Sequence, residues 1–483
     1  MNGYRTFVRD DGNIMLMSVV IVTLLVATGF GFMRWSSDER WDSEFERTTV
    51  QAYFLAQTGL IEQGLQYLRT RSPGDLPVGT VFLPSMVRPG VGSYLNTTVR
   101  RVTELGVGDV FQRSDIYDVF STGRAEFINH QLGSHDYGSK VRVERTATMR
   151  AKLRSFANYM YLTDKEKTIY NETIWFWTQD SLYGRTHSND FIGLEGSPHF
   201  YGPVSTSRDR FLYKNANNIY FKYPPIFNAP IVQFPRTANT LRAGAGVKIP
   251  SEQGRLMTHL TLRSGADIEV YQYPLGLPGE IISRESITPM KGIFVEGQVE
   301  IEGTVANWMT IGSSEDMWLV GDIIYEGADT LNGQFDEDQM TAMLGLISEK
   351  NIIIRDNTAN GHANGYWNCN RNEHLKDRHS IIIDAGMVAL GESFTFEHQN
   401  DDWELYQGPS PDERGIIHLK GAVTQARRGY IHRSNHQGTG YGKDYHYDFR
   451  FDRRPPPFYL EALDEQGHGL FDIVSWGETT PRR

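Results

Sequence analysis

Residues 13–33 read NIMLMSVVIVTLLVATGFGFM, and this stretch decides the overall plan of the chain. It contains no ionisable side chain, and the charged residues that bracket it are Asp11 and Arg34. An α-helix needs about 20 apolar residues to cross the ~30 Å hydrocarbon core of a bilayer. The positions that carry this pattern are Asn13, Ile14, Leu16, Val19, Ile21, Leu24, Leu25, Phe30 and Met33. The stretch therefore predicts one transmembrane helix.

The alternative to a retained anchor is a cleaved secretory signal. Such a signal has an apolar region of about 7 to 15 residues followed by a small-residue cleavage site. Here the chain passes from Phe32 and Met33 straight into Arg34 and Trp35, so we favour the anchor. Arginines flank both ends of the span, and the shortness of residues 1–12 decides the orientation. We expect a single-pass protein of the bacterial inner membrane. Its N-terminus would be cytoplasmic and its bulk periplasmic or displayed at the cell surface.

The helical pattern continues past the span over residues 34–72. Ser72-Pro73-Gly74 ends it, because the residue before a proline is disfavoured in the α conformation. Apolar residues recur at i, i+4, i+7, i+11 and i+14 in Phe54, Thr58, Ile61, Leu65 and Leu68, which predicts one helical face. The small residues Ala52, Ala56, Gly59 and Gly64 permit close contact. The partner would be a copy or relative of the chain, or its own sheet.

This N-terminal region has a recognisable order of parts. A leader ends in Arg9-Asp10-Asp11-Gly12, the uncharged span follows, and residues 52–68 read AYFLAQTGLIEQGLQYL. Together these parts resemble the N-terminal region of PilX-type minor pilins of type IV pilus systems. The resemblance implies that a prepilin peptidase cleaves after Gly12 and leaves Asn13 as the new N-terminus. It also implies that the helix enters a pilus or pseudopilus core. Major pilins carry glutamate at the fifth mature position, where this chain has Met17, although minor components vary there.

Two β-rich regions are expected after the helix. Residues 76–155 carry strand patterns at 93–102, 116–128 and 139–150, and they predict a pilin-like antiparallel sheet that the helix covers. Residues 156–454 carry short β-branched runs punctuated by glycine, such as IFVEG and SIIIDAGMVALG. These runs favour a β-helix or β-solenoid-like exported domain, with a β-sandwich as the alternative because the runs keep no fixed period. Residues 455–483 are expected to form a C-terminal tail.

The C-terminal region carries several distinctive stretches. They are DSLYGRTHSN at 180–189, MLGLISEKNIII at 343–354, GAVTQARRGYI at 421–431 and YGKDYHYDFR at 441–450. They resemble a domain of unassigned function found in large exported proteins with pilin-like N-termini. The resemblance implies membership of that group and no particular biochemical activity.

Composition excludes several classes of function. Lys plus Arg total 48 against 59 for Asp plus Glu, a net charge of -11, which is the wrong sign for gripping phosphate backbones. We therefore expect no nucleic-acid partner. The single cysteine, Cys369, excludes an intrachain disulfide and a thiolate zinc cluster. No cofactor is expected.

Two clusters have the residue types of a metal site. His432 and His436 have H-x-x-x-H spacing and His446 follows, but the sequence between them is typical of a loop. The acidic residues of 329–338 (Asp329, Asp336, Glu337 and Asp338) lack the spacing of a calcium loop. We predict a metal at neither place.

Catalysis and sugar binding are weighed in the same way. A β-helix invites comparison with polysaccharide lyases, for which Asp384, Arg427 and Arg428 are the available candidates. Nothing in the sequence brings these three together, so we predict no catalytic residue. The stretch 441–450 alternates aromatic and charged side chains, which suits either a sugar surface or a terminal strand. The glycan surface predicted there consists of Tyr441, Lys443, Tyr445, Tyr447 and Arg450.

The sequence thus favours a non-enzymatic pilin-like component, a minor pilin or pseudopilin, of a type IV pilus-like or type II secretion-like apparatus. It would act in assembly or in surface display and adhesion. Its partners would be the membrane, other pilins or pseudopilins through the N-terminal helix, a prepilin peptidase, and a polysaccharide or surface ligand. The rival hypothesis is a membrane-tethered β-helical protein that binds or cleaves envelope polysaccharide and never polymerises.

Overall fold

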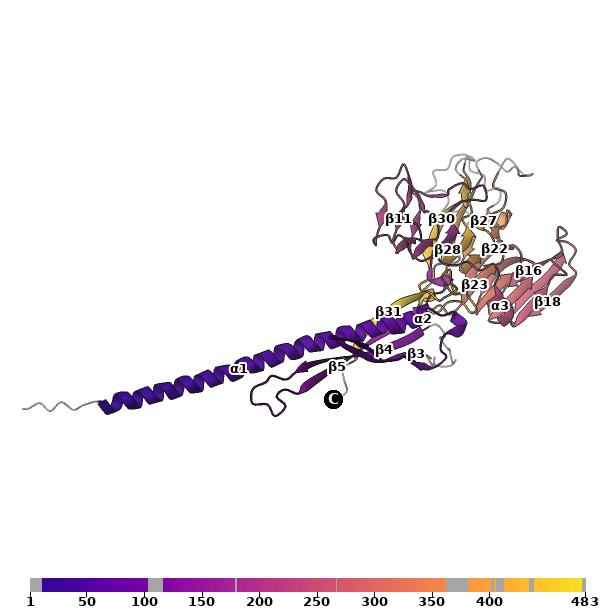
Figure 1. Ribbon diagram of the computed structural model, residues 1–483. Helices are drawn as coiled ribbons and strands as arrows, with labels where there is room; N and C mark the ends of the chain where they lie inside the picture. The colour runs from indigo at the N-terminus through magenta and orange to yellow at the C-terminus, as the bar shows by residue number, and fades with distance from the viewer. Residues whose placement is uncertain are drawn as a thin grey trace, which may run out of the picture. The chain divides into compact units, whose positions relative to one another are not determined.

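The structure is a computed structural model. It describes residues 11–102, 116–178, 180–265, 267–361, 381–400, 404, 412–433 and 438–479 (Figure 1). The chain divides into two compact units. Unit 1 comprises residues Met1–Leu153 and Gly469–Arg483, and unit 2 comprises Arg154–His468. Unit 2 is therefore an insertion in the sequence of unit 1.

Unit 1 begins with one long helix. The helix α1 (Asp11–Gly59) continues directly into a π-helical turn, η1 (Leu60–Leu65), and then into α2 (Gln66–Arg69). A short 3₁₀ turn, η2 (Pro73–Asp75), follows. The predicted helix that runs from the apolar span through the following segment and stops before Pro73 is confirmed.

The sheet of unit 1 is antiparallel and six-stranded. Its strands are β1 (Thr80–Phe82), β2 (Met86–Arg88), β3 (Gly92–Arg101), β4 (Ile116–Ile128), β5 (Lys140–Leu153) and β31 (Phe471–Thr479). Their order is β1-β3-β4-β5-β31, with β2 paired to β3. The strands predicted at 93–102, 116–128 and 139–150 correspond to β3, β4 and β5. Buried residues alternate along β4, as expected for a sheet with one covered face.

The helix packs on this sheet through small residues. A Cβ added at Gly123 of β4 would lie 1.9 Å from the backbone oxygen of Ala52, and one added at Gly64 would lie 2.2 Å from Val119 Cγ1. Only glycine allows so close an approach of backbones. Leu60 and Leu68 of the helix are then buried in the same apolar cluster as the sheet residues. The helix and sheet of unit 1 therefore share one core.

The prediction that residues 455–483 form a C-terminal tail is wrong for residues 471–479, which form a strand of the sheet. Residues Phe471–Thr479 form β31, which pairs antiparallel with β5, and Phe471 is buried in the core of unit 1. The ring of Phe471 meets the ring of Tyr117 edge-on at a centroid distance of 6.1 Å. Burial of Phe471 fixes one end of this strand on the sheet, and most of the residues that follow it in β31 are exposed.

Unit 2 is built almost entirely from short strands. Its first half contains η3 (Phe156–Asn158), β6 (Tyr161–Lys165), β7 (Trp175–Phe176), β8 (Ser181–Leu182), β9 (Thr186–Ser188), β10 (Gly193–Glu195), β11 (His199–Phe200), β12 (Val204–Thr206), β13 (Leu212–Lys214), β14 (Tyr220–Phe221), α3 (Asn239–Gly244), β15 (Val247–Pro250), β16 (Leu256–Leu262), β17 (Ile268–Pro274), β18 (Ser283–Ile287) and β19 (Gly292–Glu296). Its second half contains β20 (Gln298–Val305), β21 (Trp308–Ser313), β22 (Met317–Tyr325), β23 (Met343–Ser348), β24 (Ile352–Ile354), η4 (Thr358–Asn360), β25 (Ile381–Ile383), β26 (Gly386–Ala389), β27 (Phe394–Phe396), β28 (Asp412–Arg427), β29 (His432–Arg433), β30 (Thr439–Tyr447) and α4 (Arg450–Arg453).

Most of these strands lie in two parallel ladders. The first runs β15-β19-β21-β23-β26-β28-β6-β9-β12. The second runs from β16 through β20 and β22 to β24 and β25, and reaches β30 through β28. Consecutive strands from β19 to β24 alternate between the two ladders. The antiparallel strands β17 and β18 extend the second ladder beside β16.

The chain enters unit 2 in the middle of the first ladder. Strand β6 pairs with β28 on one side and with β9 on the other. The chain first proceeds outward through β9 and β12, accompanied by two short parallel sheets, β7-β10-β13 and β8-β11-β14. It then returns along residues 227–246 to the opposite end and proceeds from β15 back to β28. Two runs of strands thus meet at the pairing of β6 with β28.

Candidate membrane-anchoring and assembly site

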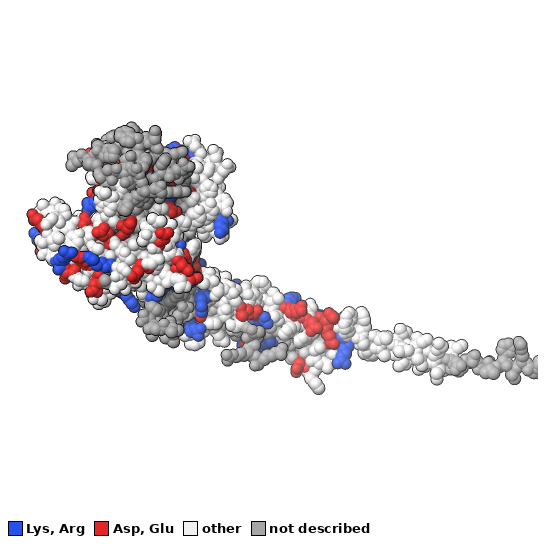
Figure 2. Space-filling view, turned by 180° about the vertical axis from the view of Figure 1, so that it is seen from behind, with Lys and Arg blue, Asp and Glu red and all other residues white. Residues whose placement is uncertain are grey.

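The predicted span occupies the first part of α1 and is exposed. Every side chain described from Ile14 to Met33 faces outward; the side chain of Ile14, for example, is 67 % exposed. Figure 2 shows this part of α1 as a narrow rod without charged side chains. Burying one large apolar side chain is worth about 1.5–3 kcal/mol, so water is a poor solvent for this segment. In the part of the chain that the structure describes, it is the one helix long and apolar enough to cross a membrane.

The polar side chains within the span satisfy their hydrogen bonds inside the helix. The hydroxyl of Ser18 donates to the carbonyl oxygen of Ile14 at 2.8 Å, and that of Thr23 donates to Val19 at 2.7 Å. Thr28 donates to Leu24 in the same way at 2.8 Å. A hydroxyl without a partner is costly in hydrocarbon, and bonding to the carbonyl four residues earlier removes that cost. The span is therefore compatible with a bilayer despite its three hydroxyls.

Gly12 and Asn13, which flank the predicted cleavage position, both lie in the first turn of α1. The side chain of Asn13 falls outside the described part of the structure. Cleavage between Gly12 and Asn13 stays a prediction.

The residues predicted for the packing helix fall on two different faces. Ala56, Gly59, Gly64, Leu65 and Leu68 are buried against the sheet of unit 1. Phe54 and Ile61 are instead 60 % and 49 % exposed. The small residues therefore serve contact with the chain's own sheet, which was one of the two alternatives for them.

The π-helical turn explains why the predicted single face divides. A π turn holds one residue more than an α turn, so it rotates every later residue around the helix axis. Before the π-helical segment, the buried positions include Ala52, Leu55, Ala56 and Gly59. Within and after it, they are Leu60, Gly64, Leu65 and Leu68. An unbroken α-helical spacing would have placed Leu65 and Leu68 on the same face as Phe54. The extra residue returns them to the sheet.

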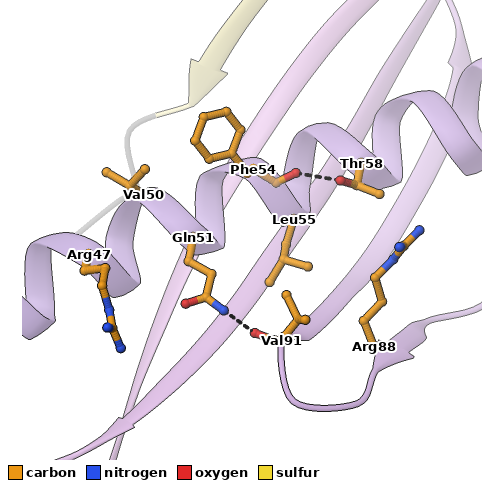
Figure 3. A pocket seen from close by; sticks show the side chains of 8 residues that line it. All are labelled: Arg47, Val50, Gln51, Phe54, Leu55, Thr58, Arg88 and Val91. Atoms are coloured by element: carbon orange, nitrogen blue, oxygen red, sulfur yellow. Dashed lines mark hydrogen bonds between the residues drawn. The ribbon is translucent and has the colours of Figure 1, made fainter.

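One flank of α1 forms one wall of an open groove. We call Val50, Phe54 and Ile61 the outward row; their side chains are all about half exposed or more. The groove has a volume of about 440 Å³ and lies between α1 and the turn that joins β2 to β3. Figure 3 shows Arg47, Val50 and Phe54 on the helix side, and Arg88 and Val91 on the turn side.

Polar contacts hold that turn against the helix. Gln51 Nε2 donates to the carbonyl oxygen of Val91 at 2.7 Å, as Figure 3 shows. Arg88 donates to Glu62 Oε1 at 2.6 Å, and this hydrogen bond raises the pKa of Arg88. The hydroxyl of Tyr94 donates to the other oxygen of Glu62 at 3.2 Å; burial, aided by this carboxylate, raises the pKa of Tyr94. The groove is thus a fixed surface whose walls are apolar and whose rim carries charge.

The glycan surface predicted on β30 is wrong for its aromatic members. Tyr441, Tyr445 and Tyr447 are buried, and the hydroxyl of Tyr441 donates to the carbonyl oxygen of Asn360 at 2.6 Å. Arg450 is buried too, bonded to Asp448 and to two backbone carbonyls of the loop after β22. Lys443, on the same face of the strand, is partly exposed and pairs with the buried Asp180 at 3.0 Å. The two-residue alternation of a strand turns Tyr441, Tyr445 and Tyr447 to one face, toward the interior, and leaves Gly442, Asp444 and His446 on the other face.

The predicted metal clusters have other partners. His446 Nε2 lies 2.8 Å from Asp444, whereas His432 Nε2 lies 3.0 Å from Glu413; His436 lies outside the described residues. Glu337 of the acidic loop pairs with Lys420. Two other acids of that loop accept backbone hydrogen bonds: Asp329 from the N–H of Leu331, and Asp336 from the N–H of Asp338. Asp338 itself pairs with the exposed Arg453. Within the described ranges, no three His, Cys, Asp or Glu side chains form a metal-binding group.

The three catalytic candidates are engaged in separate contacts. Arg427 pairs with Glu392 at 3.0 Å, and Arg428 is buried with Glu166 at 2.8 Å. Asp384 is fully buried, and its Oδ2 accepts the backbone N–H of Tyr325 at 2.9 Å. Burial raises the pKa of the Asp384 carboxyl to about 8. These groups stabilise different parts of unit 2.

Comparison with known proteins gives little beyond the structure itself. No protein-family model and no curated protein matches the chain. Among solved structures, the competence-associated pilin ComZ from Thermus thermophilus matches with 11 % sequence identity and a TM-score of 0.32, over 89 % of this chain and 97 % of that chain. Similarity at this level does not assign a shared fold. What the structure defines is a mainly β protein whose described part carries one long N-terminal helix suited to a membrane.

Proposed function

We propose that the chain is a non-enzymatic, membrane-anchored, pilin-like subunit of a type IV pilus-like or type II secretion-like apparatus. The observation that carries this proposal is the division of one continuous helix. Its first part is exposed and apolar with satisfied hydroxyls, while its second part is packed on an antiparallel sheet. A helix arranged in this way can be stored in a bilayer and later pack against other helices. The resemblance of residues 9–68 to PilX-type minor pilins supports the same proposal.

The outward row supplies a surface for assembly beyond the span. Val50, Phe54 and Ile61 are exposed on the side of α1 that the sheet leaves free. Val50 and Phe54 also line the groove of Figure 3. Exchange of lipid around residues 14–33 for neighbouring helices would continue along this row. The occupant that we propose for the groove is the apolar helix of another pilin or pseudopilin subunit.

Two sets of substitutions test anchoring and assembly separately. Placing an aspartate at the centre of a span raises the free energy of membrane insertion by roughly 2.5–3.5 kcal/mol per residue. The double variant Ile21→Asp/Leu24→Asp should therefore leave the membrane fraction. Aspartates at Phe54 and Ile61 should leave membrane retention unchanged and reduce cross-linking between subunits. Membrane fractionation and cysteine cross-linking measure the two effects. Normal fractionation of Ile21→Asp/Leu24→Asp would refute the anchor, and normal cross-linking of Phe54→Asp/Ile61→Asp would refute the assembly surface.

For unit 2, we propose a β-solenoid that the apparatus displays. The support is the parallel pairing along both ladders and the alternation of consecutive strands between them. A solenoid of this kind presents long lateral surfaces, which suits adhesion. Limited proteolysis followed by electron microscopy of unit 2 would show a rod if this proposal holds and a compact particle if a sandwich is correct.

A second candidate function, glycan binding, has an observation of its own. Three tyrosines that follow or lie on β8, β11 and β14 form a surface row in unit 2. The rings of Tyr183 and Tyr201 stack at 4.5 Å, and that of His446 stacks on Tyr183 at 5.2 Å. Tyr220 continues the row at 5.4 Å from Tyr201. Because the ring faces cover one another, the row offers hydroxyl groups and ring edges, beside the carboxylate of Asp444, to sugar hydroxyls.

Removal of the hydroxyls alone tests the glycan candidate. The triple variant Tyr183→Phe/Tyr201→Phe/Tyr220→Phe keeps the ring stack and should lose retention on an envelope polysaccharide column. Tyr213→Phe is the matched control, since Tyr213 is 61 % exposed and lies outside the row. A chain that lacks residues 1–33 should behave like the full chain, because the helix that covers the sheet of unit 1 is kept. Equal retention of the triple variant and the control would refute this surface.

A further inference from the structure

The tip of the β4–β5 hairpin is fastened to α1 close to the end of the apolar span. Leu132 N donates to Ser37 Oγ at 2.7 Å, and Ser37 Oγ donates in turn to the carbonyl oxygen of His130 at 3.3 Å. Gln131 Nε2 donates to Asp38 Oδ1 at 2.9 Å. Three consecutive residues of the tip are therefore held by two consecutive residues of the helix.

These contacts set the depth of the tip relative to the span. Ser37 follows Met33, the last residue of the span, by four residues, or about 6 Å along the helix axis at 1.5 Å per residue. Phe32, Met33, His130 and Leu132 line one shallow hollow. When residues 14–33 occupy hydrocarbon, the tip consequently lies at the level of the lipid headgroups.

The tip exposes apolar and aromatic side chains at this level. Leu132 is 46 % exposed and Tyr137 is 59 % exposed, while Trp35, just after the span, is 58 % exposed. Tyrosine and tryptophan are enriched where hydrocarbon meets water, because their rings are apolar and their polar atoms keep hydrogen bonds. The exposed surface of the span thus continues onto the hairpin.

The tip has a defined conformation. Asn129 N donates to the carbonyl oxygen of Ser139 at 2.8 Å, and Gly138 N donates to that of Asn129 at 2.7 Å. Asn129 Oδ1 accepts the backbone N–H of Gln131 at 2.9 Å. The ring of Tyr137 contacts that of His130 edge-on at 5.9 Å. Leu132 and Tyr137 are thus presented on a preformed loop and need little ordering upon binding.

We propose that residues 129–139 form a second membrane contact, which places Leu132 and Tyr137 in the interfacial region of the bilayer beside the end of the span. This inference rests on the proposed anchoring function. A single helix leaves the rotation and tilt of unit 1 free, and a second contact beside it restricts both. The hairpin contacts the sheet side of α1, so the outward row is left free for assembly. When the subunit leaves the bilayer, this loop must therefore also leave the headgroup region.

Depth-dependent quenching in the full chain tests the proposal. In a Cys369→Ser background, single cysteines replace Leu132, Phe82 or Leu24 and carry a fluorescent label. Phe82 is the matched control because it is 77 % exposed and its neighbouring segment contacts Gln63, about 45 Å along the helix from Met33. The protein is reconstituted at low density in phosphatidylcholine vesicles that carry a nitroxide on either the headgroup or the acyl chain.

We expect the headgroup nitroxide to quench the label at position 132 several-fold more than the label at position 82, and the acyl-chain nitroxide to quench the label at position 24. Equal quenching at 132 and 82, with position 24 quenched, would overturn the hairpin contact and leave the anchor intact. Absence of quenching at 24 would overturn both. A third outcome is that the headgroup nitroxide does not quench the label at position 132, and that this label becomes shielded from solvent only as the protein density in the vesicles rises. That result would assign the tip to a contact with a neighbouring subunit and would also overturn the proposal.

A substitution in the labelled chain provides a second readout. Tyr137→Asp places a charge on the exposed tip without removing a buried contact, and should lower quenching at position 132 several-fold. Phe54→Asp, on the outward row, should leave that quenching unchanged. Unchanged quenching in the Tyr137→Asp chain would contradict an interfacial position of the tip.

Discussion

The Cα atoms of Phe471 and Leu153 are paired in adjacent antiparallel strands, although the whole of unit 2 lies between them in the sequence. Both connections to unit 2 therefore leave unit 1 from neighbouring positions at one end of β5 and β31. The sheet of unit 1 is complete only when residues on either side of the long insertion have met. Closing so long a loop costs entropy that local contacts do not repay, so β31 should join late during folding.

Phe471 should be essential for the attachment of β31. Its ring is buried among Leu153, Tyr117 and other core residues, so Phe471→Ala should destabilise unit 1 by about 3–5 kcal/mol. Val474→Ala is the matched control on the same strand, because Val474 is 58 % exposed. Hydrogen exchange of the β5 amides measures the effect. Equal exchange rates in the two variants would show that β31 contributes nothing to the core.

Close approach of α1 and β4 should depend on Gly123. Gly123→Ala places a methyl group against the backbone of Ala52 and Ala56, which cannot move without displacing the helix, and should cost about 1–3 kcal/mol or more. Gly79→Ala is the control, since no atom lies within 4 Å of its added Cβ. Urea denaturation followed by circular dichroism compares them. Similar midpoints for the two variants would contradict the packing of the helix on the sheet.

Unit 2 should lose stability in mild acid through His187. Burial lowers the pKa of His187 to about 4, and the ring is held neutral between Ser205 and Asn189. Between about pH 6.5 and pH 4 the unfolded chain binds a proton that the folded chain does not, so stability falls as pH falls through this window, by roughly 3 kcal/mol. His187→Gln should flatten that dependence in denaturant titrations. An unchanged pH profile in this variant would exclude His187 as the source.

Asp384 should have the opposite effect. Its folded pKa of about 8 lies above the ordinary value of 3.8, so the folded chain holds a proton that the unfolded chain releases. Stability therefore falls as pH rises from about 4 to about 8, by several kcal/mol. Asp384→Asn keeps an acceptor for Tyr325 N–H and should be more stable than the native chain at pH 8. A variant less stable than the native chain at that pH would show that the carboxylate is favourable where it lies.

The sequence was sufficient where one strong pattern governs a segment. The apolar run of 13–33 predicted the exposed helix, and the strand predicted at 116–128 matched β4 over the same residues. It was insufficient where tertiary contacts decide. One π turn divided the predicted face of Phe54 and Leu68, and no local pattern reports such a turn. In β30, alternation was recognised, but without the core its inward side could not be chosen, and the tyrosines were placed outside.

Mass spectrometry of the N-terminus of the protein isolated from its native membrane tests the central claim most directly. The account predicts a chain that begins at Asn13, after removal of residues 1–12. Such a chain would have entered the pilin pathway, with α1 as an assembly element. A chain that begins at Met1 or its neighbour would contradict this account and leave the span as a simple tether, which would favour the polysaccharide-binding rival.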